Sequence, residues 1–223
     1  MKEESLLSRW CEKVWLYCVY ALGIGMLVLL IVQWSNLSVA AKLMYFLAFM
    51  LSVHVFEENT FPGGFFYINN IGQKSDEPMV YPQNRLINMW TNLGAEIFFI
   101  ILALNAESIQ GAVVFLVTIF GFAECIHHTR DEITTYKMFK DKGAKTIYTP
   151  GIFTSFFGLL EMSICGTVWM LRNPIGTKDI LTGIFFVVGV IVIGILIPFR
   201  ISTKVKSKTY AFRSNGYYSR YIK

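Results

Sequence analysis

The sequence predicts an all-α membrane protein, a polytopic helical bundle of about six transmembrane helices with the N- and C-termini in the cytoplasm. Three observations carry this prediction. The 223 residues are 54% hydrophobic and 16% charged, with a mean hydropathy of +0.50, which is too apolar for the wetted surface of a soluble domain. Six apolar segments are separated by turn-forming residues. The basic residues gather in alternate connections between those segments.

The first apolar segment, residues 14–32, carries no charge and is long enough at ~1.5 Å per residue to cross a hydrocarbon core of ~30 Å. No Ala-x-Ala cleavage site follows it, so we expect an uncleaved anchor. The other segments have turn residues such as Pro62-Gly63-Gly64 and Asn173-Pro174 between them. They cover residues 39–56, 86–104, 112–125, 151–171 and 180–199, and the fourth of the six is the shortest.

The distribution of Lys and Arg gives the topology. With six spans, 17 of the 20 basic residues fall on one side, which includes the N-terminal segment from Lys2 and the tail that ends at Lys223. Only Lys42, Arg172 and Lys178 fall on the other side. Because basic loops stay in the cytoplasm, both termini are predicted to be cytoplasmic, and we expect the cell (plasma) membrane as the location.

The chain has no evident internal boundary, so we expect a single membrane domain over residues 1–223. The tail, residues 200–223, interleaves basic and aromatic residues, which suits either an anionic lipid surface or a solvated extension. The net charge of +5 is explained by the topology and comes with no nucleic-acid-binding motif, so no nucleic-acid partner is expected. The lipid bilayer is the predicted partner, and the oligomeric state stays open.

Two polar clusters end the second and fourth apolar segments. His54, Glu57 and Glu58 have the spacing i, i+3, i+4, which puts three side chains on one face of a helix. The second cluster repeats the spacing with Glu124, His127 and His128. All three histidines of the chain belong to these clusters, and the topology places both clusters at the cytoplasmic face.

Further polar residues accompany the clusters. The third segment has a stripe of Asn88, Asn92 and Glu96, in which we expect the two asparagines to form interhelical hydrogen bonds. Asp131 and Glu132 are expected to be solvated loop residues. The fifth segment places Glu161 near the middle of the bilayer, where a carboxylate must be paired or protonated, on a stripe with Thr154 and Gly158 that favours helix packing over a direct role in a site.

Imidazole and carboxylate groups together are the ligands of zinc, iron or manganese, and Glu124-x-x-His127 has the spacing used in di-metal carboxylate bundles. A site for one or two divalent metal ions is therefore the leading hypothesis, ahead of a proton or ion relay and of a structural polar network. The aromatic stretch from Phe61 to Tyr67 is a membrane-interface anchor or a flap over the site. The ligand candidates are His54, Glu57, Glu58, Glu96, Glu124, His127 and His128.

The stretch His54-Val-Phe-Glu57-Glu58 resembles the HXXEE family of integral membrane proteins, whose function is uncharacterised. Further elements of that family have counterparts here, in the order Asn92 and Glu96, then Glu124, His127 and His128, then the Tyr-x-Pro-Gly sequence at 148–151. The resemblance spans roughly residues 43–161. It implies a presumed enzyme of unknown reaction. With Tyr148, which the resemblance adds, the further site candidates are Asn92, Tyr148, Thr154 and Glu161.

A metal site with these ligands suits hydrolysis, in which activated water attacks an ester, amide or phosphate, with Glu58 or Glu57 as the general base. A lipid-like substrate is expected because the site lies between helices near the leaflet. The alternatives are a proton- or cation-coupled transporter that uses the same cluster, and a di-iron oxidoreductase acting on acyl or sterol-like substrates. A scaffold whose basic tail recruits a partner is the third class.

Overall fold

The computed structural model describes residues 5–222, and within them it contains helices and no strand. Lys2 and Lys223, counted above among the basic residues, lie outside the described residues. Six helical stretches are long and apolar enough to cross a membrane, which confirms the predicted fold class. They are Leu6–Val32, Val39–Asn59, Arg85–Leu104, Gln110–Lys142, Ile152–Arg172 and Thr177–Val205.

Several of these stretches combine α-helix with short π- or 3₁₀-helical turns, labelled η. In chain order the elements are α1 (Leu6–Arg9), η1 (Trp10–Val14), α2 (Trp15–Val32), α3 (Val39–Asn59), α4 (Phe65–Gly72), α5 (Arg85–Leu104), η2 (Ala106–Ser108), α6 (Gln110–Phe139), η3 (Lys140–Lys142), α7 (Ile152–Thr154), η4 (Ser155–Leu160), α8 (Glu161–Arg172), α9 (Thr177–Gly189), η5 (Val190–Leu196), α10 (Ile197–Val205), η6 (Lys208–Tyr210) and η7 (Gly216–Arg220).

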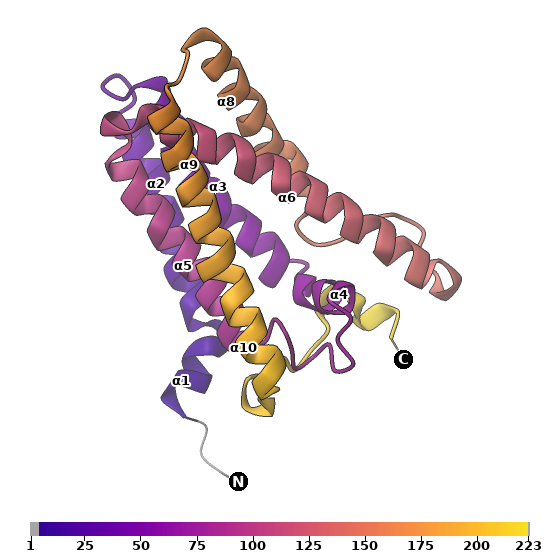
Figure 1. Ribbon diagram of the computed structural model, residues 1–223. Helices are drawn as coiled ribbons and strands as arrows, with labels where there is room; N and C mark the ends of the chain where they lie inside the picture. The colour runs from indigo at the N-terminus through magenta and orange to yellow at the C-terminus, as the bar shows by residue number, and fades with distance from the viewer. Residues whose placement is uncertain (1–4, 223) are drawn as a thin grey trace.

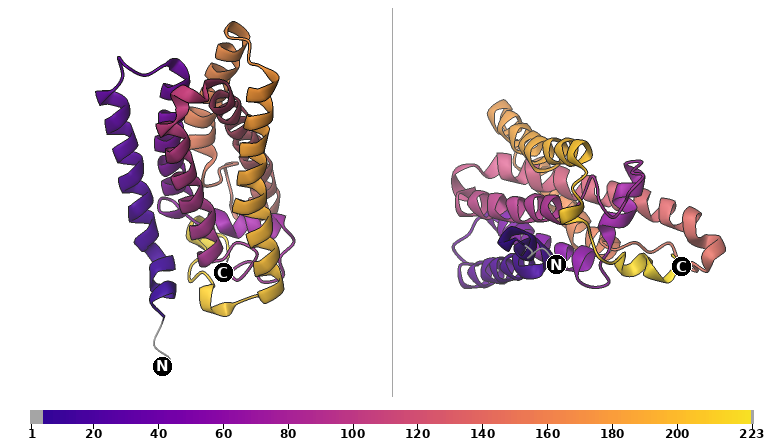
Figure 2. Two further views of the ribbon diagram at one scale, coloured as in Figure 1. Left: turned by 60° about the vertical axis from the view of Figure 1, so that its left-hand side comes forward. Right: turned by 90° about the horizontal axis from the view of Figure 1, so that it is seen from below.

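The long helices form one bundle in which α3 packs against α2, α5 and α6, while α8 and α9 pack against α6 (Figures 1 and 2). Both ends of the described chain lie at the same end of the bundle, which we call the terminal face. The C-terminal end of α3 and the N-terminal end of α5 also lie there. The side of the membrane on which the terminal face sits stays a prediction.

Local sequence explains where the two central helices begin. Ser38 caps α3 by accepting a hydrogen bond from the backbone N–H of Ala41 at 3.1 Å, and Asn84 caps α5 by accepting one from Ile87 at 3.0 Å. Small residues such as Ala41 and Ala48 on α3 are fully buried and let α2 and α5 approach closely. The core is thus apolar along most of the bundle and becomes polar only near the terminal face.

The fourth span differs from its prediction. Residues 112–125 were expected, whereas α6 runs from Gln110 to Phe139, because the helical pattern continues beyond the apolar stretch into residues that a hydropathy argument treats as loop. Asp131 is therefore not a solvated loop residue: it lies inside α6 and only 1% of its surface is exposed. Figure 1 shows α6 extending well past the end of α3.

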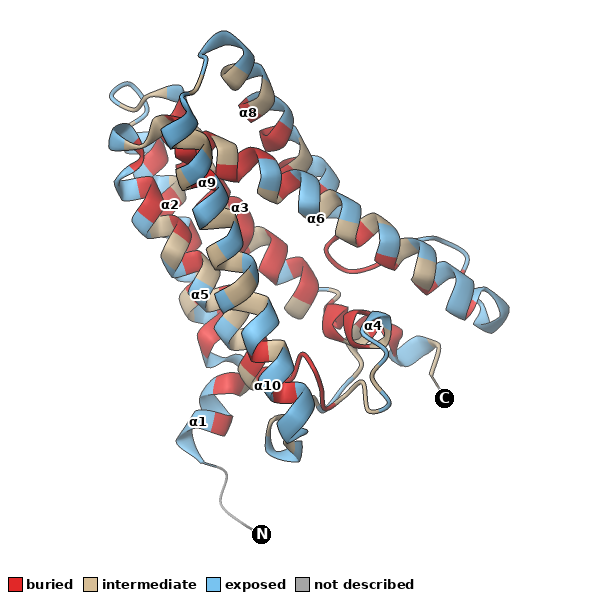
Figure 3. Cartoon of the chain, viewed as in Figure 1, coloured by how far each residue is buried: buried red, intermediate tan, exposed pale blue. Residues whose placement is uncertain are grey.

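The tail folds back onto the terminal face and is not a solvated extension. Tyr217 and Tyr218 are buried against Phe65 and Phe139. Figure 3 shows that much of α4, which contributes Phe65, is buried as well. The ring of Phe212 stacks on Phe66 with centroids 3.5 Å apart. This end of the chain therefore forms part of the wall around the polar end of the bundle.

Buried Arg85 at the start of α5 ties the tail to the N-terminal helix. Its guanidinium donates hydrogen bonds to the carbonyl oxygens of Ala211 at 2.9 Å, Thr209 at 2.8 Å and Ser8 at 3.1 Å, and it forms an ion pair with Glu12. The guanidinium is therefore fully used as a structural clamp.

Candidate metal centre

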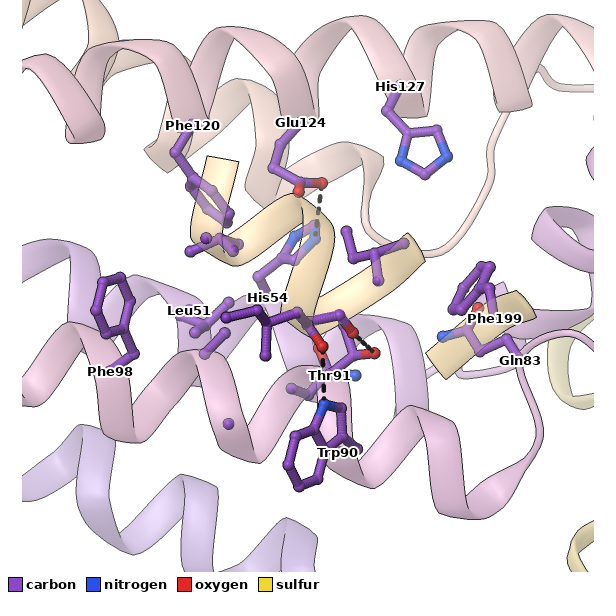
Figure 4. Close-up of a pocket in the computed structure, with 18 of the residues that line it drawn as sticks. Leu51, His54, Gln83, Trp90, Thr91, Phe98, Phe120, Glu124, His127 and Phe199 are labelled. Atoms are coloured by element: carbon purple, nitrogen blue, oxygen red, sulfur yellow. Dashed lines mark hydrogen bonds and ion pairs between the residues drawn. The ribbon is translucent and has the colours of Figure 1, made fainter. Parts of the chain in front are cut away.

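Two pairs of side chains spaced i, i+4 meet where α3 and α6 lie side by side. His54 and Glu58 come from α3, and Glu124 and His128 come from α6. The Nε2 atoms of the two histidines are 3.2 Å apart, and Glu58 Oε1 lies 3.5 Å from His54 Nε2 and 3.3 Å from His128 Nε2. Glu124 Oε2 approaches the same two nitrogens at 3.8 and 3.6 Å, and Figure 4 shows it facing His54.

Three of these residues form a buried group that could hold a metal ion. The donor atoms of His54, Glu58 and His128 lie within 4.8 Å of one another, and the three side chains are almost completely buried. A tetrahedral ion with bonds of about 2.0–2.1 Å separates its ligand atoms by roughly 3.3–3.4 Å. The three observed separations of 3.2, 3.3 and 3.5 Å match that spacing without any rearrangement of the helices.

A chain of hydrogen bonds fixes the orientation of His54. Its Nδ1 lies 2.7 Å from the hydroxyl of Thr154, and that hydroxyl donates to Glu57 Oε2, also at 2.7 Å. Because the hydroxyl has one proton, which goes to the carboxylate, it must accept from His54 Nδ1–H. The lone pair of a neutral His54 then lies on Nε2 and points into the group, as a metal ligand requires.

Glu57 itself faces away from the group and holds the beginning of the fifth span. Its carboxylate accepts hydrogen bonds from the backbone N–H groups of Phe153 at 3.2 Å and Thr154 at 2.9 Å, and from the Tyr148 hydroxyl at 2.8 Å. Burial, followed by the nearby Glu57 carboxylate, raises the pKa of Tyr148, so this phenol stays protonated and acts as a donor. Glu57 is therefore positioned to orient a ligand rather than to be one.

His128 is held by packing. Its ring lies 4.7 Å from the ring of Phe65 and 4.9 Å from that of His54, measured between centroids, and its Nδ1 has no hydrogen-bond partner among the described residues. Gly151 lies at the Cε1 edge of the ring; it has a φ of +95°, and a Cβ there would fall 2.1 Å from His128 Cε1. Only glycine therefore fits between the α7 turn and this imidazole.

Two predicted candidates on α5 lie outside the group. Glu96 is completely buried, and neither of its carboxylate oxygens has a hydrogen-bond partner among the described residues. Asn92 donates to the backbone oxygen of Asn88 at 2.9 Å, within its own helix, so the interhelical bond expected for it is not formed. Asn88 does make such a bond, to Asn59 on α3.

The remaining candidates also point elsewhere. His127 lies beside the ring of Phe65 and pairs with Asp131 at 3.4 Å, and its side chain is 35% exposed. Glu161, at the start of α8, is exposed on the outside of the bundle, so the helix packing expected there does not involve its carboxylate. Phe65 takes the role of a cover over the imidazoles, whereas Phe61 is 73% exposed.

A cavity of about 400 Å³ opens onto the group and extends between α5, α6 and α9. His54, Glu58 and Glu124 line it. Figure 4 shows His54 and Glu124 between Phe98 and Phe120 on one side and Gln83 and Phe199 on the other. The wall contributed by α9 and η5 was not foreseen from the sequence, because its residues belong to a uniformly apolar span without any polar marker.

A family profile described as a protein of unknown function with HXXEE motif matches residues 43–166, more than half of the chain. The chain belongs to the HXXEE family. The matched region contains α3, α5, α6 and the group formed by His54, Glu58 and His128, so the family's motif supplies two of the three donor side chains. No curated protein and no solved structure matches the chain.

Proposed function

We propose that this HXXEE protein is a membrane-embedded, metal-dependent hydrolase that acts on a lipid-like substrate. In this proposal His54, Glu58 and His128 hold one divalent ion, either zinc or iron, with manganese as a further candidate. The spacing of their three donor atoms, close to the edges of a metal-centred tetrahedron, is the observation that carries the proposal.

Three protein ligands leave room for a fourth, exchangeable position, which is how catalytic metal sites differ from structural ones. The ion would polarise water and the substrate oxygen as a Lewis acid. Glu124 is the remaining carboxylate at the centre; its side chain is 23% exposed and reaches the cavity. We assign it the role of general base, which the sequence had suggested for Glu57 or Glu58, because Glu57 is saturated with hydrogen bonds.

The rival function is a proton- or cation-coupled transporter that uses the same residues. It is favoured by one observation: within a candidate membrane-spanning helix, the buried carboxylate of Glu96 has no hydrogen-bond partner among residues 5–222. The di-iron oxidoreductase needs a second ion site, and His54, Glu58 and His128 are the one group of three donor side chains found within residues 5–222. The hydrolase therefore uses the observed group most directly.

The test is elemental analysis of detergent-purified protein after metal loading, comparing wild type with His54→Ala, His128→Ala and His127→Ala. His127 is the matched control, since it neighbours His128 but pairs with Asp131 outside the group. We expect near-stoichiometric metal in wild type and His127→Ala, and its loss in the other two variants. Zinc would favour hydrolysis, and iron would favour oxygen chemistry.

Folded wild-type protein that refuses Zn, Fe and Mn would overturn the metalloenzyme proposal. Gradient-driven uptake of a cation or substrate in proteoliposomes, abolished by Glu96→Gln, would then favour the transporter.

A further inference from the structure

The cavity beside the candidate metal centre has a distinct division of polarity. Its far wall is built from aromatic and aliphatic side chains of α5, α6 and α9. Toward the terminal face the polar lining residues include the amides of Asn69, Gln73 and Gln83 and the imidazole of His127, beside the rings of Phe65 and Phe199. The carboxylates of Glu58 and Glu124 lie between the two regions. The cavity therefore offers an apolar compartment, a reactive centre and a neutral polar compartment in that order.

The rim of the cavity is continuous with the lipid-facing surface. Trp90, Phe185 and Ile193 line it and are also 53%, 72% and 60% exposed on the outside of the bundle. The Trp90 indole N–H donates to the carbonyl oxygen of Ile193 at 3.1 Å, and the hydroxyl of Thr91 donates to that of Gly194 at 2.8 Å. These bonds fix α5 against the π-helical turn η5 at one edge of the cavity. The exposed rim residues, in contrast, place the apolar compartment within reach of the bilayer.

We propose that the cavity binds an uncharged, single-chain fatty acyl ester whose alcohol part carries hydroxyl groups, and that this lipid reaches the centre laterally from the bilayer. The volume of about 400 Å³ lies near the lower end of the roughly 300–1,000 Å³ typical of small-molecule sites, which suits one acyl chain rather than two. The identification of the reaction rests on the proposed hydrolase function, whereas binding of the lipid does not.

In the metal-free protein, charge selects against the phosphorylated relatives of such a lipid. A phosphate on the alcohol part, beyond the centre, would find no lysine or arginine among the described residues that line the cavity, and in the metal-free protein it would lie near the carboxylates of Glu58 and Glu124. The exposed amide of Gln73 instead offers a neutral ester both a donor and an acceptor, whereas Asn69 Nδ2 already donates to Gln83 Oε1 and Gln83 Nε2 to Asn88. The lining thus selects the uncharged head group.

The reaction that fits this pose is hydrolysis of the ester bond. The oxygen of one water molecule bonds to the acyl carbon, Glu124 takes a proton from that water, and the bond between the acyl carbon and the alcohol oxygen breaks. The departing oxygen receives the proton from Glu124. A fatty acid and a neutral alcohol are the two products, and no further reactant is consumed.

Binding is tested first, with a monoacylglycerol that carries a photoreactive diazirine on its acyl chain, incorporated into detergent micelles with purified, metal-free protein. Three glycines provide variants that differ in position alone: a Cβ at Gly94, Gly189 or Gly25 would meet no atom within 4 Å. Gly94 and Gly189 line the cavity, whereas Gly25 lies on α2 outside it. Leucine at either of the first two positions fills the apolar compartment.

We expect labelled peptides from α5 and α9 in wild type and in Gly25→Leu, and at least tenfold less labelling in Gly94→Leu and Gly189→Leu. Unlabelled monoacylglycerol should compete, whereas lysophosphatidate of the same chain length should compete at least tenfold more weakly. Equal labelling in all four proteins, or equal competition by the two lipids, would overturn the inference.

Hydrolysis is tested second, with metal-loaded protein and esters of glycerol that have either a long or a short acyl chain. Gly189→Leu should lower kcat/KM at least tenfold for the long chain and leave the short chain unchanged. If the protein cleaves esters in a metal-dependent way but Gly189→Leu affects long and short chains alike, the lipid inference is wrong and the hydrolase function stands. If the cavity is labelled as expected but the protein cannot be loaded with metal, the hydrolase function is wrong and the lipid inference stands.

Discussion

The clusters on α3 and α6 are chemical mirror images: His54-x-x-Glu57-Glu58 on one helix and Glu124-x-x-His127-His128 on the other. In both, the residues spaced i, i+4 enter the metal group or border it, and the residue at i+3 points elsewhere. The two i+3 residues nevertheless have different fates. Glu57 is buried and accepts hydrogen bonds from the start of the fifth span, whereas His127 is 35% exposed and pairs with Asp131.

The difference teaches that a shared helical face does not define a ligand set. Residues at i+3 and i+4 are neighbours on a helix, yet they diverge by about 100° around its axis, and the packing of a third element decides which one enters the group. On α3 that element is the α7 turn, which captures Glu57. On α6 it is the same turn, whose Gly151 lies against His128, while His127 pairs with Asp131 and shares the ring of Phe65 with its neighbour.

The strongest test of this difference replaces each of the two adjacent carboxylates, Glu57 and Glu58, by its amide. Glu58→Gln should abolish near-stoichiometric metal binding, because it replaces the single charged donor of the three ligands by a neutral amide, which binds a divalent ion much more weakly. Glu57→Gln should leave the ligands in place and weaken metal affinity ~10–100-fold, the range seen when an orienting group is changed. Titration with zinc, monitored by a competing chelator dye, measures both. Identical losses in two equally folded variants would mean that Glu57 is a ligand.

A second large effect is expected at the glycine behind His128. Gly151→Ala should expel the imidazole from the group, because the new Cβ would lie 2.1 Å from the ring. Gly143→Ala is the matched control: its φ of +93° resembles the +95° of Gly151, but a Cβ there would meet nothing within 4 Å. In the control, only backbone strain should lower the free energy of unfolding, by ~1–2 kcal/mol, and the metal should stay bound.

Thermal unfolding in detergent and metal content together separate the two contributions. If Gly151→Ala keeps full metal occupancy, the contact with His128 is not what requires glycine at this position.

Much of this arrangement was predictable from spacing and hydropathy. The spans follow from apolar length, and the pairs His54/Glu58 and Glu124/His128 follow from helical periodicity. The diverging roles of Glu57 and His127 were not predictable, since they depend on the docking of α7 and Phe65.

The cavity was equally hidden in the sequence. Phe185 and Gly189 belong to a span whose composition is uniformly apolar, so nothing in the local pattern distinguishes residues that line a cavity from those that face lipid. The buried position of Asp131 was missed for a related reason: hydropathy ends a span where polarity begins, although the helix continues.

A smaller effect is expected from removing the Thr154 hydroxyl, which links the start of the fifth span to His54 and Glu57 on α3. Thr154→Val keeps the shape of the side chain but removes the group that accepts from His54 Nδ1 and donates to Glu57. We expect a loss of metal affinity of ~10-fold or more, with the ligands still present. Thr154→Ser restores the hydroxyl and should bind metal like wild type. Should valine bind metal as tightly as threonine, the orientation of His54 would have to be maintained by packing alone.

The smallest effect on the centre is expected for Tyr148→Phe, because Glu57 keeps its three other hydrogen bonds, from Thr154 and the backbone of Phe153. The variant should lose less than about tenfold in metal affinity. Its signature lies in the pH dependence of stability. Below about pH 10 the phenol is protonated in both folded and unfolded protein, so it adds no slope.

Above that pH the unfolded phenol ionises, while the folded one, whose pKa is raised by burial and by Glu57, stays protonated. The free energy of unfolding of wild type should therefore fall by ~1.4 kcal/mol per pH unit more steeply than that of Tyr148→Phe, until the folded phenol also ionises. Tyr217 and Tyr218, whose pKa values burial also raises, contribute equally to both proteins and cancel in the comparison. Unfolding measured between pH 9 and about 11 gives the difference directly, and parallel curves would show that Tyr148 does not donate to Glu57 in the folded protein.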